Sequence, residues 1–62
     1  MIETIQPFLQ DIATKLLPNG ETIYSCIPKR GVKVMSTGYQ KTEDEAIEFF
    51  YNELVKKGLI NG

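Results

Sequence analysis

A chain of 62 residues that can form no internal cross-link must be held together by its apolar core alone. Cys26 is the only cysteine, so no disulfide can form within the chain. There is no histidine, and one thiol does not supply the four nitrogen or sulfur ligands of a structural zinc site. Because a chain this short buries only about 60% of the surface that its unfolded form exposes, the core is marginal. We therefore expect no cofactor and no metal, and we expect self-association as one way to bury more surface.

Charge and hydropathy indicate the cellular compartment of the protein and limit the classes of partner it can bind. The longest apolar runs are two or three residues, far short of the roughly 20 that a membrane span requires. Glu3 stands where a secretory signal carries positive charge, and no apolar segment follows it. We expect a cytoplasmic protein with a reduced thiol and no membrane partner. The formal net charge of −1 gives no overall electrostatic attraction to nucleic acid.

The N-terminal apolar residues recur at steps of three and four, which is typical of one face of an amphipathic helix. They are Ile2, Ile5, Leu9, Ile12 and Leu16, with Phe8, Ala13 and Leu17 widening the stripe. Pro7 is tolerated only in a first turn, so the pattern predicts a helix that begins between Thr4 and Pro7. Pro18, Asn19 and Gly20 then predict a stop and a turn.

Strand-forming residues follow in two runs, 22–27 and 32–37, around a short turn at 28–31 that contains Gly31. This pattern predicts a hairpin between the two runs. Its register stays open: a loop of two or four residues places Ile27 opposite Val32, whereas a loop of three places Cys26 opposite Val34. A slip of one residue exchanges the buried and exposed faces. Residues 38–41 add a bend or a short third strand.

The second helix has the strongest local signals. Thr42 and Glu45 have the spacing of a capping box, and acids fill the first turn, where the helix dipole favours them. Lys56 and Lys57 lie at the opposite end, and Gly58 suits the left-handed position that ends a helix. These residues predict a helix over about 43–57. The order helix, hairpin, helix predicts one two-layer α+β domain over 1–62, with both helices on one face of a small antiparallel sheet.

The side chains offer little support for catalysis, and we expect that this protein is not an enzyme. Histidine, the commonest general base, is absent. Cys26 lies within a predicted strand, where a buried thiol acts as a small apolar side chain. Glu43, Asp44, Glu45 and Glu48 are explained by helix-start chemistry and lack the spacing of a calcium-binding loop.

A protein-binding surface is the leading expectation. Phe49, Phe50 and Tyr51 are consecutive, so they spread over about 200° of a helix, more than the usual apolar stripe needs. Aromatic side chains are enriched at interface cores. We therefore expect Phe49 and Tyr51, extended by Leu59 and Ile60, to contact a protein partner or a second copy. The size of the chain fits a regulator or inhibitor of the kind that phages and other mobile elements encode.

Nucleic-acid binding is the alternative. Residues 22–42 contain four basic side chains and no acid, whereas residues 43–53 contain five acids. A two-stranded ribbon fits the major groove of DNA, and tyrosines can stack on bases. The residues expected to take part are Lys29, Arg30, Lys33 and Lys41, with Tyr24 and Tyr39.

Two family resemblances concern the same region. The predicted order helix, strand, strand, helix resembles a shortened double-stranded-RNA-binding domain, but this chain begins its second helix with Glu43-Asp44-Glu45 where that family has phosphate-gripping lysines. The stretch from Gly38 to Ala46 resembles the strand-to-helix junction of the three-stranded arm-binding domains of some phage and transposon integrases. That second resemblance covers about nine residues and includes neither the leading strands nor the catalytic domain.

Overall fold

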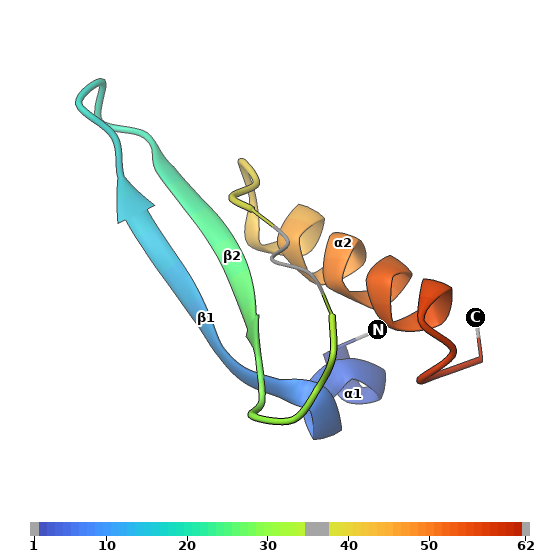
Figure 1. Ribbon diagram of the computed structural model, residues 1–62. Helices are drawn as coiled ribbons and strands as arrows, with labels where there is room; N and C mark the ends of the chain where they lie inside the picture. The colour runs from blue at the N-terminus through green and yellow to red at the C-terminus, as the bar shows by residue number, and fades with distance from the viewer. Residues whose placement is uncertain (1, 35–37, 62) are drawn as a thin grey trace.

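A strand hairpin and one long helix make up most of the fold (Figure 1). The computed structural model describes residues 2–34 and 38–61. The elements are α1 (Ile2–Ile5), a 3-10 turn η1 (Gln6–Phe8), β1 (Leu9–Leu16), β2 (Thr22–Pro28) and α2 (Glu43–Lys56). The predicted α+β class is confirmed. The order is helix, strand, strand, helix, although only β2 and α2 coincide with predicted elements.

The predicted long N-terminal helix is wrong, because the α-helix is the single turn Ile2–Ile5 and residues 9–16 form a strand. Pro7 lies in the 3-10 turn that ends α1, and the chain then extends into β1. Leu9 and Ile12 both pack against the core although they are three residues apart. The β1–β2 register shifts between Leu9 and Asp11, so Gln10 is an extra residue in β1. An extra residue moves the alternation of side chains by one position, which explains the helix-like step of three from Leu9 to Ile12.

The hairpin forms between different partners from those predicted. The Pro18-Asn19-Gly20 turn joins β1 to β2, with the Leu17 N–H donating to the Glu21 carbonyl at 2.8 Å. Residues 32–34, predicted as part of the second strand, form no strand, and 35–37 lie outside the described residues. The Lys29 N–H donates to the Phe8 carbonyl at 2.8 Å, which holds the end of β2 beside the start of β1. Neither predicted register occurs within the described part of the chain.

The sheet has two strands, and β2 pairs with β1 along one edge. At its other edge Tyr24 and Gln40 exchange backbone hydrogen bonds of 2.8 and 2.7 Å. Of the bend or short third strand expected at 38–41, the structure has a single bridge at Gln40 and a bend at Lys41. Ile12, Tyr24 and Cys26 point toward the core. Since side chains alternate along a strand, we define the outer face as the opposite set: Asp11, Ala13, Lys15, Ile23, Ser25, Ile27, Tyr39 and Lys41.

The predicted second helix is confirmed with its end signals. Thr42 caps α2, because its hydroxyl oxygen accepts from the Glu45 N–H at 3.1 Å and lies 3.2 Å from Glu45 Oε1. At the other end, Gly58 has a φ of 75° and the Leu59 N–H donates to the Leu54 carbonyl at 2.9 Å. This is the left-handed helix ending that the sequence predicts.

The core lies between the inner face of the hairpin, α2 and α1. Six apolar residues form it: Ile5, Cys26, Ala46, Ile47, Phe50 and Leu54. α2 packs against β2, and α1 packs against α2. Within the described residues, no helix is long and apolar enough to cross a membrane.

Candidate functional site

The outer face of the hairpin brings together two lysines and a tyrosine from two segments, β1 and the stretch around Gln40. Lys15 lies on β1, opposite Ile23 of β2, and Tyr39 and Lys41 flank the residue that bridges to Tyr24. The Lys15 Nζ lies 5.9 Å from the centroid of the Tyr39 ring, within the range of a cation–π contact. Tyr39 remains 47% exposed. This face therefore presents positive charge beside an accessible aromatic ring.

A second basic group occupies the loop after β2. Lys29, Arg30 and Lys33 are all exposed there. Six residues of extended chain separate Ile23 from Lys29, which places this group roughly 20 Å along the hairpin from Lys15 and Lys41. The hairpin thus carries basic side chains toward both of its ends.

Tyr24 does not join Tyr39. It is half-buried on the inner face, where it packs against the core cluster. The structure therefore groups Tyr39 with Lys41 and adds Lys15, which the sequence analysis missed because it placed residue 15 on a helix. The signal that points to Lys15 is its position on β1 opposite Ile23, and this pairing is a tertiary property.

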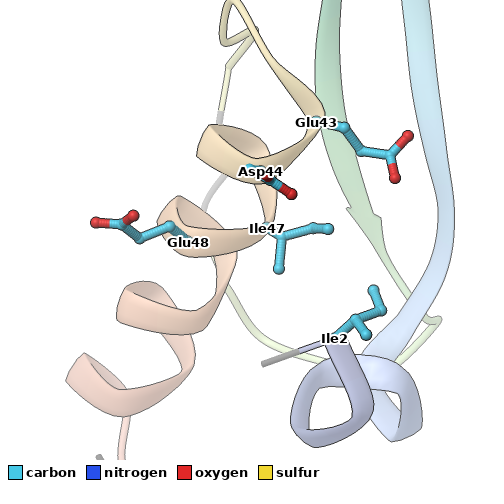
Figure 2. A pocket seen from close by; sticks show the side chains of 5 residues that line it. All are labelled: Ile2, Glu43, Asp44, Ile47 and Glu48. Atoms are coloured by element: carbon cyan, nitrogen blue, oxygen red, sulfur yellow. The ribbon is translucent and has the colours of Figure 1, made fainter.

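Six of the eight acidic side chains lie on the helices, whereas Asp11 is on the outer face of β1 and Glu21 is in the turn. Figure 2 shows a pocket of about 430 Å³ between α1 and α2, lined by Ile2, Glu43, Asp44, Ile47 and Glu48. In that view the carboxylate of Glu43 points toward the strands, while that of Glu48 points to the other side of the helix. No three Asp, Glu, Cys or His residues in the described part of the chain are arranged to hold a metal ion. The three carboxylates that line this pocket make the helix layer negatively charged.

The predicted protein-binding residues are divided between two flanks of α2. Phe49 is 40% exposed and lines a hollow of about 170 Å³ with Gln40, Glu45, Glu48 and Asn52. Tyr51 is half-buried and packs against the core, about 200° around the helix from Phe49. Ile60 also packs against the core, whereas Leu59 is 41% exposed. The structure does not bring Phe49 and Tyr51 into one continuous surface.

Cys26 is placed as the sequence indicated, inside the core. It is 2% exposed and faces α2 from β2. Burial raises the pKa of its thiol, and the negative charge of Glu43 raises it further. The thiol is therefore protonated at neutral pH, and a reactive thiolate requires the opposite shift.

No family model, no curated protein and no solved structure matches this chain.

Proposed function

We propose that this protein is a non-enzymatic binding module that contacts nucleic acid through the outer face of its hairpin. One observation carries the proposal: Lys15, Lys41 and the accessible ring of Tyr39 gather on the sheet face that points away from the core. Lysines neutralise phosphates and an aromatic ring stacks on bases, so the combination suits a nucleic-acid backbone with accessible bases.

The distribution of charge favours one orientation of the molecule. The acids at 43–48 are on α2, which packs on the inner side of the sheet. The basic loop at 29–33 lies at the end of β2. Residues 9–41 carry five basic side chains against the two acids Asp11 and Glu21. A polyanion is therefore attracted to this part of the chain and repelled by the helix layer, although the net charge is only −1. This separation of charge supports binding of nucleic acid through the hairpin and argues against binding at the start of α2.

The number of charges sets the strength of binding. Five basic side chains belong to the two groups on the hairpin: Lys15, Lys29, Arg30, Lys33 and Lys41. If all of them contact phosphates of duplex DNA, the logarithm of the binding constant falls with the logarithm of salt with a slope of up to about −4.5. We therefore expect modest affinity that is lost at high salt.

A binding assay with a matched charge control tests the proposal. We expect Lys15→Gln/Lys41→Gln to weaken binding to labelled duplex DNA, single-stranded DNA and RNA, and to reduce the salt slope by about 2 on duplex DNA, because two phosphate contacts are lost. Lys56→Gln/Lys57→Gln removes the same charge from the far end of α2. Fluorescence anisotropy over a salt series measures both effects.

Two results would refute this function. One is undetectable binding of the wild-type chain to every probe at low salt. The other is an equal loss of affinity in both double variants, since that would show a response to net charge alone and not to the outer face.

Protein binding through α2 is a second candidate, and the exposure of Phe49 favours it. An apolar ring that is 40% exposed beside a hollow of about 170 Å³ is an anchor of the type found in interface cores. The two candidates respond to different substitutions. Phe49→Ala would abolish protein binding and leave affinity for nucleic acid unchanged, whereas the outer-face lysine variant would do the reverse.

A further inference from the structure

The outer edge of β1 is an open strand edge. β2 covers the inner edge along most of the length of β1, and in Figure 1 β1 lies at the side of the molecule. Within the described residues, no segment pairs with the other edge. An open edge presents backbone donors and acceptors that can pair with another strand.

The hairpin register tells which backbone groups point outward. The Leu17 N–H donates to Glu21, so Leu17 and, by alternation, Lys15 and Ala13 bond toward β2. The N–H and C=O groups of the intervening residues, Ile12 and Thr14, therefore point away from β2. Two outward-facing residues at this spacing suffice for the centre of an antiparallel ladder.

We propose that a second copy of this chain pairs with that edge, β1 against β1 in antiparallel orientation, about a twofold axis at Ala13. Ile12 then pairs with the partner's Thr14, and Thr14 with the partner's Ile12, each pair through its outward-facing backbone groups. Ala13 meets the partner's Ala13 at a non-hydrogen-bonded position, where Cα atoms approach to about 4.5 Å and a small side chain is favoured. This inference does not depend on the proposed nucleic-acid binding.

Charge complementarity selects this register. Asp11 and Lys15 lie on the same face of β1, two residues to either side of Ala13. Pairing about Ala13 places Asp11 opposite the partner's Lys15, and Lys15 opposite the partner's Asp11. Registers centred on Asp11 or Lys15 would oppose like charges, and registers centred on Ile12 or Thr14 would leave the charges opposite Ala13 or other apolar residues. Opposite charges across a strand pair are favourable and like charges are unfavourable.

One local bond changes when the edges meet. In the single chain the Ile12 N–H donates to Asp11 Oδ1 at 2.8 Å. In the dimer the Ile12 N–H donates to the carbonyl of the partner's Thr14, and the Asp11 carboxylate turns to the partner's Lys15. Asp11 thus covers an edge donor in the monomer and forms an ion pair in the dimer.

The symmetry has a consequence for the whole assembly. A twofold axis perpendicular to a continuous sheet places both copies of α2 on one face and both outer faces on the other. The Lys41 and Tyr39 residues of the two copies then lie on one extended surface.

Charge exchange across the edge tests the dimer. We expect Asp11→Lys alone, and Lys15→Asp alone, to raise the dissociation constant by about tenfold or more, since each variant opposes like charges twice. Asp11→Lys/Lys15→Asp restores opposite charges and should restore dimerisation. Glu21→Lys, which changes the net charge in the turn by the same amount and sign as Asp11→Lys, should leave dimerisation unchanged. Sedimentation equilibrium from about 1 μM to about 1 mM covers the range in which a weak dimer is measurable.

A backbone variant keeps the test valid if a charge variant fails to fold. The Thr14 N–H points outward, so Thr14→Pro removes no hydrogen bond to β2 but blocks pairing at the edge. We expect this variant to be monomeric with an unchanged circular dichroism spectrum. In the wild type we expect the Ile12 and Thr14 amides to exchange more slowly with solvent as the concentration rises.

Three outcomes would overturn the inference. A wild-type chain that is monomeric at the highest concentration excludes the dimer. A dimer that persists in Thr14→Pro uses another surface. If the single exchanges abolish dimerisation and the double exchange does not restore it, the register about Ala13 is wrong.

Discussion

Cys26 and Ser25 are neighbours on β2 that point to opposite faces, and both are buried. An antiparallel sheet commonly packs one face on the core and exposes the other. Ser25 lies opposite Ala13 on the outer face and is nevertheless only 9% exposed.

The thiol of Cys26 makes stability depend on pH. Burial raises its pKa in the folded chain, whereas the unfolded thiol titrates near its ordinary value of about 8.5. Above that pH unfolding releases a proton, so the stability present below about pH 8.5 declines as pH rises toward the folded pKa. We expect the free energy of unfolding, measured in urea from pH 7 to 10, to fall with a slope that Cys26→Ala reduces. An equal slope in both proteins would contradict this origin.

At the scale of the element, the two ends of the chain differ in how locally their structure is specified. The bonds that begin and end α2 join residues within five positions of one another, from Thr42 to Glu45 and from Leu54 to Leu59. β1 has no comparable local signal, and its extended form depends on β2. The same apolar spacing that indicates a helix in isolation becomes a strand with one extra residue when a partner strand is present.

The Thr42 cap is expected to contribute to the stability of α2. Thr42→Ala leaves the Glu45 N–H without its side-chain acceptor, so we expect a loss of about 1 kcal/mol in the free energy of unfolding. Asn52→Ala, on the exposed middle of the same helix, should be neutral or slightly stabilising, because alanine has the higher helix propensity. Urea unfolding followed by circular dichroism compares the two, and equal losses would show that the cap contributes nothing specific.

The whole molecule depends on few buried side chains. The three largest fully buried ones are Phe50, Ile5 and Leu54, and they come from both ends of the chain. The principal extents are 37, 21 and 17 Å, because the hairpin reaches beyond the helix (Figure 1). Leu16, near the turn, is accordingly 71% exposed although its position on β1 matches the inner face.

Two adjacent phenylalanines test where the stability resides. We expect Phe50→Ala to cost about 3–5 kcal/mol, which is most of the roughly 3–9 kcal/mol available to a chain of 62 residues, so the variant should be largely unfolded at room temperature. Phe49→Ala, at 40% exposure, should cost about 1 kcal/mol or less. Thermal and urea unfolding measure both, and similar losses would place Phe49 in the core as well.

Some residues of the outer-face site could be predicted from local sequence, and others depend on contacts between distant segments. The sequence is enough to predict that residues 22–42 are basic and that Tyr39 and Lys41 are candidate site residues, because both follow from the local composition. Lys15 could not, since its place beside Tyr39 requires β1 to pair with β2 and β2 with Gln40. The separation of Phe49 from Tyr51 follows from helical geometry, but which of them the core covers depends on where β2 and α1 pack.

The α+β class, the turn at Pro18-Asn19-Gly20, the strand that begins at Thr22 and both ends of α2 could be predicted without a structure, because they depend on propensities and hydrogen bonds between near neighbours. Pairing between distant segments makes residues 9–16 a strand, places β2 between β1 and Gln40, and puts Lys15, Tyr39 and Lys41 on one face. Strand pairing joins residues far apart in the chain, and a short apolar pattern is compatible with helix or strand until a partner strand supplies the missing hydrogen bonds.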